Sequence, residues 1–353
     1  MKIAMVSKYL PSVIKSGVTN QVHWLANALC TDGQTHVTLF SISEPPADAL
    51  YQVKRVPIPL WIKNSRFMNR YFVALYFGKL NFDSFDIIHS HGDNYLLFEK
   101  RKMVRTFYGS ALAESFYGRN FVRFFSQFIL YLLEFVCGFL SRVNVGISNN
   151  TKRLLPFIKF VIPVGLDLEK FNPAPHLKTN YPTILFVGTL KGRKRGKKII
   201  EIFQKEVLPS IPSAELWVVH KGPFVKDQGH IKYFIDISQD ELIRLYQRAW
   251  IFCSASSYEG FGVPYLEAMA CGTPVITTQN QGAQELSNQS QCFEISLLED
   301  IGQRISKLLL NQKQRQMYID QGLDFVKKFD IRKTALQYKK VYEDVLKRGL
   351  PKC

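Results

Sequence analysis

Cysteine is scarce and unpaired in this sequence. The six cysteines, at positions 30, 137, 253, 271, 292 and 353, include no pair in C-x-x-C spacing, and most lie within apolar segments. This pattern argues against a zinc site or a disulfide framework, and it favours buried free thiols. Because free thiols are typical of a reducing compartment, we expect a cytoplasmic protein.

Long apolar runs are also missing. The most apolar run, residues 128–140, is 13 residues long and contains Glu134, whereas a helix that spans a membrane needs roughly 20 apolar residues. The first eight residues become polar too soon for a signal peptide, and they read instead as a first strand. The sequence therefore predicts no transmembrane segment.

Acidic residues are few relative to basic ones. The 353 residues include 46 Lys and Arg against 29 Asp and Glu, which gives a formal net charge of +17. Such an excess suits an anionic partner, and charge alone does not choose among nucleic acid, anionic lipid headgroups and a phosphorylated small molecule. No Asp-x-Asp pair is present to bind Mg²⁺ at phosphates, so we expect no metal and no other cofactor.

Short apolar strands alternate with helices along the chain. Residues 3–6 and 36–40 read as buried strands, and the helical spacing of residues 18–29 places a helix between them. This order predicts a parallel sheet with right-handed crossovers, and thus an α/β fold. The same pattern restarts at residue 183, after a proline-containing linker at 164–182.

Two segments of the first half are less regular. Residues 44–82 carry four prolines, and we expect them to be irregular, with an aromatic and basic piece from 61 to 82. Residues 116–142 predict one long aromatic helix with arginines at its ends. Two interpretations of this helix stay open, which are packing in the core and a face that lies on a membrane surface.

Two predicted strands end in polar tips. Residues 85–92 lead to His91, and residues 104–110 lead to Tyr108. Because ligands of open α/β sheets bind at the carboxyl ends of strands, both side chains are site candidates. A histidine at a strand end is also commonly structural, and the His89-x-His91 pair lacks the further ligands that a metal site needs.

A glycine-containing loop between a strand and a helix carries two carboxylates. The stretch 250–271 reads as a strand, a loop and a helix. Free N–H groups at the start of such a helix attract anions, and glycines let the backbone approach a ligand. The candidate ligand-binding residues of this stretch are Glu259, Gly260, Phe261, Gly262 and Glu267. The pattern favours a phosphorylated, hydroxyl-rich ligand.

A basic cluster follows the strand predicted at 183–188. Residues 191–198 include six basic residues in eight, among them Arg193, Lys194 and Arg195. A charge run can be a solvated surface or a nucleic-acid patch, but this one stands at the carboxyl end of a strand in the same domain as Glu259. We therefore expect it to neutralise a pyrophosphate.

The stretch from Glu259 to Val275, EGFGVPYLEAMACGTPV, resembles the signature of the retaining GT-B glycosyltransferases of family 4, also called glycosyl transferases group 1. In that signature two glutamates are separated by seven residues. Residues 86–91, 162–167 and 186–190 resemble further landmarks of the family in the expected order. The resemblance thus covers nearly the whole chain.

The resemblance implies two Rossmann-like domains that face a cleft. Residues 1–164 would form the acceptor-side domain, and residues 165–335 the domain that binds the nucleotide sugar. Residues 336–353 would form a C-terminal helix and tail that return to the first domain.

The resemblance also implies roles for single residues. Glu259 would lie near hydroxyls of the transferred sugar, and Glu267 would accept hydrogen bonds from the ribose. Lys194 would hold the diphosphate, supported by Arg193 or Arg195. The backbone from Gly260 through Phe261 to Gly262 would meet sugar and phosphate.

A few positions depart from the family pattern. Gly17 looks like the remaining member of a glycine pair that faces the donor phosphate, and Tyr108 stands where a histidine often approaches the donor sugar. Thr189 replaces a second phosphate arginine, and Val164 replaces a usual asparagine.

These implications lead to a metal-independent hexosyltransferase that retains anomeric configuration. Its donor would be a UDP- or GDP-linked sugar and its acceptor a glycan or a lipid-linked glycan of the cell surface, with an anionic membrane surface as a further partner. A catalytically idle family member that only binds sugar or a partner is one alternative. A nucleic-acid-binding protein is another, but no recognition helix or stacking motif supports it, so we expect no nucleic-acid partner.

Overall fold

The computed structural model describes residues 1–14, 16–92, 94, 95, 97, 102–116 and 121–349. The chain folds into two compact units. Unit 1 comprises Met1–Gly165 together with Ile331–Cys353, and unit 2 comprises Leu166–Asp330. Within the described residues the cysteines are free thiols, as the sequence predicts.

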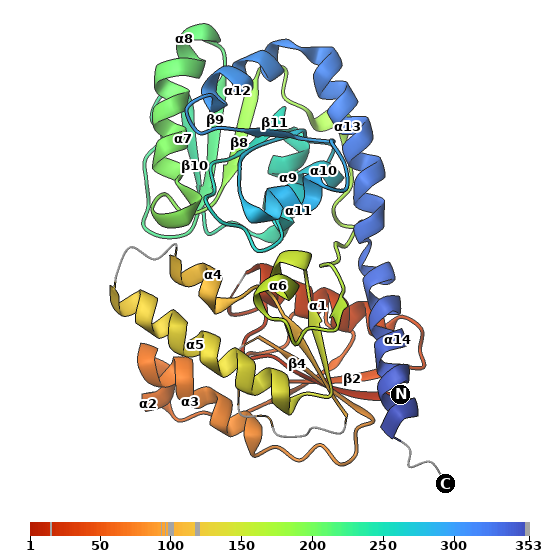
Figure 1. Cartoon of the computed structure of the whole chain (residues 1–353). Helices are drawn as coiled ribbons and strands as arrows, with labels where there is room; N and C mark the ends of the chain where they lie inside the picture. The colour runs from red at the N-terminus through yellow and green to blue at the C-terminus, as the bar shows by residue number, and fades with distance from the viewer. Residues whose placement is uncertain (15, 93, 96, 98–101, 117–120, 350–353) are drawn as a thin grey trace. The chain divides into compact units, whose positions relative to one another are not determined.

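Unit 1 is built on a seven-stranded parallel sheet with the order β3-β2-β1-β4-β5-β6-β7 (Figure 1). Its strands are β1 (Lys2–Val6), β2 (His36–Ser41), β3 (Gln52–Arg55), β4 (Ile87–His91), β5 (Met103–Phe107), β6 (Val143–Gly146) and β7 (Phe160–Val161). The central strands are apolar and buried because helices cover a parallel sheet on both faces. Strands β2 and β3 extend the sheet to one side of β1, whereas β4 to β7 extend it to the other, so the strand order reverses between β1 and β4.

The helices of unit 1 come from both ends of the chain. They are α1 (Gly17–Cys30), α2 (Leu60–Asn64), α3 (Arg66–Gly78), α4 (Ala111–Phe116), α5 (Phe121–Leu140), α6 (Asn149–Leu154) and α14 (Ile331–Gly349). Helix α14 packs on α1 and buries Tyr338 and Tyr342 in unit 1. The prediction that the C-terminal helix returns to the first domain is confirmed.

One prediction for unit 1 is wrong. Residues 44–82 are not irregular, because β3, α2 and α3 occupy most of the stretch. Helix α3 buries Val73 and Phe77 but leaves Phe67 exposed, so apolar residues on several sides hide its period. The long helix predicted over 116–142 corresponds to α5, which begins at Phe121. Helix α4 ends at Phe116, and the residues between the two helices lie outside the described part of the chain.

Unit 2 repeats the architecture with a six-stranded parallel sheet of the order β10-β9-β8-β11-β12-β13. Its strands are β8 (Thr183–Val187), β9 (Glu215–His220), β10 (Ile231–Ile235), β11 (Ile251–Ser254), β12 (Val275–Thr278) and β13 (Glu294–Ser296). The strand order of this sheet reverses between β8 and β11. Ligands of doubly wound sheets bind at this kind of reversal, beyond the carboxyl ends of the strands.

Helices cover the sheet of unit 2 on both faces (Figure 1). They are α7 (Gly196–Ile202), which continues through a π-helical turn (Phe203–Val207) into α8 (Leu208–Ser210), α9 (Gln239–Arg248), α10 (Val263–Ala270), α11 (Gln281–Ser287), α12 (Ile301–Leu310) and α13 (Gln312–Val326). Helix α9 begins with a capping box, in which Ser238 and Glu241 bond each other's backbone. Helix α11 and strand β13 are not among the predicted elements.

Candidate functional site

Two loops meet where the strand order of unit 2 reverses, between β8 and β11. The loop after β8 turns through a short 3₁₀ helix at Gly192–Lys194, and the loop after β11 carries Glu259. The backbone N–H of Ser257 donates to the carbonyl oxygen of Arg193 at 2.9 Å, which ties the two loops together. The predicted basic cluster and the predicted carboxylate loop therefore form one site.

Glu259 lies between two basic side chains. Lys194 Nζ is 2.5 Å from Glu259 Oε1, and Arg193 Nη1 is 3.3 Å from Glu259 Oε2. Arg193 Nη1 also donates to the carbonyl oxygen of Tyr258 at 2.6 Å. We call Glu259, Lys194 and Arg193 the Glu259 cluster.

The Glu259 cluster carries net positive charge. Only 5% of Glu259 is exposed. Burial raises the pKa of Glu259, but the charges of Lys194 and Arg193 and the hydrogen bonds to the carboxylate outweigh burial, and its pKa is lowered. The carboxylate is therefore ionised at neutral pH, and two cations face one anion. The remaining positive charge suits a phosphate group.

Glycine is required at two positions around the cluster. A Cβ on Gly188, at the end of β8, would lie 3.0 Å from Cβ and Cγ of Lys194, so the bare glycine lets the lysine stem pack over the backbone. Gly262 has a φ of 96° and starts α10, and its Cβ would lie 2.6 Å from Cδ2 of Tyr265. A side chain at either position would displace the site loops.

Glu267 lies on α10 and differs from Glu259 in its partners. It is 7% exposed, and its Oε2 accepts a hydrogen bond from Tyr246 Oη at 3.1 Å. Burial raises the pKa of Glu267 to about 7, although the Tyr246 hydrogen bond and the charge of Lys194 oppose the rise. This carboxyl group is thus poised to change its charge near neutral pH.

Several positioning residues of the site were not predicted from the sequence. Asn280 caps α11 by accepting from the N–H of Ala283, and its amide donates to Tyr265 Oη at 3.0 Å and to the carbonyl oxygen of Ser256 at 3.3 Å. Gly282 packs so closely that its Cβ would lie 2.8 Å from Cβ of Glu259. The polar residues that follow the apolar strand at Val275–Thr278, with an Asn as helix cap, were the available signal.

The remaining predicted donor residues of unit 2 have distinct surroundings. Phe261 is 3% exposed and packs on Phe329 with ring centroids 5.7 Å apart, so its side chain holds the loop and only its backbone can face a ligand. Gly260 is half-buried in the same loop. The exposed Arg195 has a φ of 54° and begins α7.

His91 and Tyr108 form a neutral pair in unit 1. His91 ends β4, Tyr108 follows the neighbouring strand β5, and His91 Nδ1 is 2.9 Å from Tyr108 Oη. Nε2 of His91 is buried and has no hydrogen-bond partner within the described part of the chain. Burial, with a smaller contribution from Arg105, lowers the pKa of His91 to about 3, and burial raises the pKa of Tyr108. Neither side chain changes its charge near neutral pH.

A second histidine ties the sheet of unit 1 to α14. His89 Nδ1 is 2.6 Å from Tyr342 Oη, and His89 Nε2 is 2.8 Å from Thr106 Oγ1. Thr106 Oγ1 is in turn 2.8 Å from Tyr338 Oη. Both ring nitrogens of His89 therefore have protein partners, which leaves this histidine no lone pair for a metal. Over the described ranges no group of three metal-ligating side chains is present.

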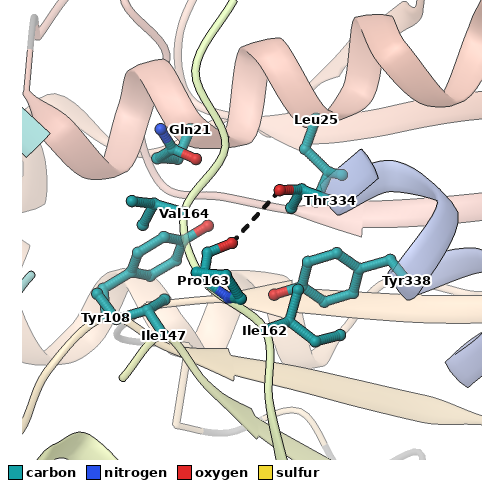
Figure 2. Close-up of a pocket in the computed structure, with 9 residues that line it drawn as sticks. All are labelled: Gln21, Leu25, Tyr108, Ile147, Ile162, Pro163, Val164, Thr334 and Tyr338. Carbon is teal, nitrogen blue, oxygen red and sulfur yellow. Dashed lines mark hydrogen bonds between the residues drawn. The ribbon is translucent and has the colours of Figure 1, made fainter. Parts of the chain in front are cut away.

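The Tyr108 side chain borders a small cavity of unit 1 (Figure 2). The cavity also touches Gln21 of α1 and Tyr338 of α14, and Thr334 Oγ1 donates to the carbonyl oxygen of Pro163 beside it. Its volume is about 10 Å³, which is room for about one water molecule and not for a hexose.

Gly17 begins α1, and its surroundings are open. A Cβ at this position would meet no heavy atom of the described structure within 4 Å. The helix start is held by Ser16 and Thr19, each of which bonds the backbone of the other. Gly17, His91 and Tyr108 belong to unit 1, whereas the other predicted site residues belong to unit 2.

The sequence of unit 2 matches a known family. Residues 168–324 match the family model described as glycosyl transferases group 1. Over this segment the chain is similar to that family. The segment contains the Glu259 cluster and Glu267, so these residues lie within the part of the chain that matches the family model.

Three similar proteins extend the comparison. An uncharacterised glycosyltransferase of Methanocaldococcus jannaschii is 26% identical and aligns over 98% of this chain and 99% of its own length. The phosphatidyl-myo-inositol mannosyltransferase of Mycobacterium leprae is 24% identical over 53% of this chain, and the match spans 54% of that protein, about half of its length. The structure of HepE from Anabaena, in complex with UDP-glucose, is 13% identical and covers 98% of this chain and 100% of its own, with a TM-score of 0.72.

The similar structures identify the architecture of the chain. The two parallel-sheet α/β units correspond to the GT-B fold, as the sequence predicts. Among the described residues, no helix is long and apolar enough to cross a membrane.

Proposed function

We propose that this chain transfers a hexose from a UDP- or GDP-linked sugar to a glycan or a lipid-linked acceptor, with retention of anomeric configuration and without a metal ion. The observation that carries the proposal is the Glu259 cluster. It is a buried, ionised carboxylate held by Lys194 and Arg193, at the point where the strand order of unit 2 reverses. The relatives support the same class of reaction, since one is named a mannosyltransferase and another is solved with UDP-glucose.

The charge of the cluster matches the leaving group. Breakage of the bond between the anomeric carbon and the diphosphate leaves negative charge on the departing oxygen. Lys194 and Arg193 stand where preformed positive charge can stabilise that oxygen without a metal ion. The acceptor oxygen bonds the anomeric carbon on the face from which the diphosphate departs, and the proton of the acceptor passes to the departing phosphate.

The two glutamates divide the donor between them. Glu259 holds Lys194 and faces the hydroxyls of the transferred sugar, while Glu267 accepts hydrogen bonds from the ribose. Both are buried, so a donor hydroxyl would replace little water and gain strong hydrogen bonds to a carboxylate. His91 and Tyr108 would act as neutral hydrogen-bond partners, because neither ionises near neutral pH.

Nucleotide binding is the first test. The melting temperature of the chain is measured with UDP, GDP, UDP-sugars and GDP-sugars, and we expect one base series to raise it while AMP, a nucleoside monophosphate, does not. A chain that none of these nucleotides stabilises would contradict the proposal. A gain with AMP equal to that with the diphosphates would contradict the role of the basic cluster.

Transfer is the second test. With the nucleotide sugar that binds, release of the nucleoside diphosphate is followed in the presence of candidate glycans and of lipid-linked glycans. We expect release to continue in EDTA and the anomeric proton of the product to keep the configuration of the donor by NMR. Binding without release across all acceptors would favour the idle family member, and an inverted product would exclude the proposed stereochemistry.

A further inference from the structure

Helix α5 exposes an apolar stripe that runs from Phe124 to Phe139. Its opposite side is buried, with Gln127, Leu130 and Cys137 packed against unit 1. The stripe consists of large side chains that are between 36% and 70% exposed, which are Phe124, Phe125, Phe128, Ile129, Leu132, Val136 and Phe139. Their spacing of three and four residues places them on one side of the helix.

Helices α2 and α3 continue this surface. Tyr71 Oη of α3 is 2.7 Å from Ser126 Oγ of α5, and Arg70 donates to Gln127 at 3.1 Å, so α3 lies beside α5 (Figure 1). The exposed apolar residues of α2 and α3 are Leu60, Trp61, Phe67, Phe72 and Leu75, at 36% to 72% exposure. We call these residues and the stripe of α5 the apolar–basic face. Water-exposed proteins rarely keep so many neighbouring apolar side chains uncovered.

The charge of this face has one sign. Residues 51–81 contain six Lys and Arg and no Asp or Glu. The one acidic residue of α5, Glu134, accepts hydrogen bonds from the N–H of Ala111 at 2.9 Å and from Ser110 at 3.2 Å, so its carboxylate serves α4. Lys63 and Lys79, near the C-terminal ends of α2 and α3, are exposed. Anionic groups are therefore the complementary partner.

The chemistry of the face distinguishes a lipid surface from a second copy of the chain. Two copies that met through this face would bring basic side chains of equal sign together, and Glu134, the one carboxylate of these helices, already accepts from Ser110 and Ala111. A bilayer offers both complements at once, since its headgroups carry negative charge and its acyl boundary takes up aromatic and aliphatic side chains.

We propose that α2, α3 and α5 form a docking surface for an anionic lipid bilayer. The helices lie along the membrane, with the apolar side chains in the boundary between headgroups and acyl chains. Lys63 and Lys79 contact the headgroups. The inference is independent of donor chemistry, because binding to vesicles requires neither a nucleotide nor catalysis.

Vesicle flotation tests the surface in the wild-type chain. Vesicles of phosphatidylcholine alone are compared with vesicles that contain phosphatidylglycerol, at low and high salt. We expect the chain to float with the anionic vesicles, to remain behind with the neutral ones, and to lose part of its binding at high salt. A chain that floats with neither vesicle, or equally with both, would overturn the proposal.

Two sets of variants locate the surface. Phe125→Gln/Leu132→Gln/Phe139→Gln removes apolar side chains from the stripe, and its matched control removes three exposed apolar side chains elsewhere, Leu310→Gln/Met317→Gln/Leu336→Gln. Lys63→Glu/Lys79→Glu removes basic residues from the face, and its control is Lys313→Glu/Lys347→Glu. We expect at least about a tenfold loss of vesicle binding for each test variant, since one basic residue near a membrane is worth about fivefold.

The variants also separate the alternatives. Glutamine is a good helix former, so the altered positions should leave the melting temperature near that of the wild type. If the triple variant were unstable, the single variant Phe139→Gln would take its place with a smaller expected loss. Equal losses in a control variant would refute the location. Conversion of a wild-type dimer to a monomer by the triple variant, with vesicle binding unchanged, would show a protein interface instead.

Discussion

The two sheets share the same kind of strand order, but they carry different side chains at the ends of their strands, charged in unit 2 and neutral in unit 1. In each sheet the strand order reverses at the first strand of the unit, between β1 and β4 in unit 1 and between β8 and β11 in unit 2. At the reversal in unit 2 stand the charges of Glu259, Lys194 and Arg193. In unit 1 the pair His91 and Tyr108 is buried and neutral. A shared scaffold therefore does not determine what its strand ends bind.

The difference follows from what surrounds each group. Glu259 is buried together with counter-charges, so ionisation costs little and its pKa is lowered. Burial, with a smaller contribution from the charge of Arg105, disfavours a proton on the His91 ring, so its pKa drops to about 3. Charge in unit 2 favours phosphate, whereas His91 and Tyr108 offer only dipoles. Four experiments would break or sharpen this contrast.

The largest expected effect is that of Lys194→Ala. Loss of the ammonium group removes the charge that would stabilise the departing diphosphate, so kcat/KM for transfer should fall on the order of 100- to 1000-fold. Lys198→Ala is the matched control, because Lys198 lies four residues on and pairs with the exposed Glu201. Steady-state release of the nucleoside diphosphate measures both. Similar losses in the two variants would mean that bulk basic charge, not the cluster, matters.

Tyr342→Phe should weaken unit 1 while leaving nucleotide binding intact. It leaves Nδ1 of the buried His89 without its partner, and an unsatisfied buried group costs roughly 1–3 kcal/mol of the free energy of unfolding. Urea denaturation measures the loss. Tyr76→Phe, at a half-buried tyrosine of α3, is the control and should change stability by less than about 0.5 kcal/mol. An unchanged urea midpoint for Tyr342→Phe would show that the His89 hydrogen bonds do not stabilise unit 1.

Nucleotide-sugar affinity should rise with pH because of Glu267. Its pKa of about 7 means that the group holds its proton in most molecules at pH 6 and has lost it in most at pH 8. If only the carboxylate accepts from both ribose hydroxyls, the affinity should increase about tenfold over this range. Titration calorimetry with a nucleotide sugar, whose diphosphate does not itself titrate here, measures it. Glu267→Gln should bind weakly and equally at both pH values, and a slope that survives in this variant would assign the proton elsewhere.

The smallest expected effect is an absence of change at His91. Because its pKa is about 3, the ring should stay neutral from pH 5 to pH 8. The ¹³C shift of the His91 ring, assigned by comparison with His91→Asn, should be constant over this range, with free histidine as the reference. A titrating signal would show that the ring gains a proton, and the contrast between the two units would then be one of degree.

The sequence predicted the site where its chemistry is continuous along the chain. The run from Glu259 to Val275 and the cluster around Lys194 are both dense in polar or glycine residues, so each was recognised, and the α/β order then brought them to one edge. The contact between Ser257 and Arg193 that joins them depends on strand order, which no local pattern contains.

Other features of the fold and the site could not be predicted, because no pattern among neighbouring residues of the sequence reveals them. Gly282 supports Glu259 from a helix that was not predicted, and nothing in its neighbourhood of the sequence points to that contact. The apolar residues of α3 lie on buried and exposed sides alike, so their periodicity was lost. His89 was grouped with His91 as a strand tip, although its hydrogen-bond partner Tyr342 and the Tyr338 ring that packs on it stand more than two hundred residues away.

That separation has a consequence for biogenesis. Unit 2 is inserted into unit 1 between Gly165 and Ile331, and α14, which brings Tyr338 and Tyr342 to His89, follows the whole insertion. During synthesis from the N-terminus, unit 2 has its complete sequence outside the ribosome before unit 1 does. Until α14 arrives, the emerging sheet of unit 1 lacks the tyrosines that seal its polar interior. The first unit to start is therefore the last to be finished.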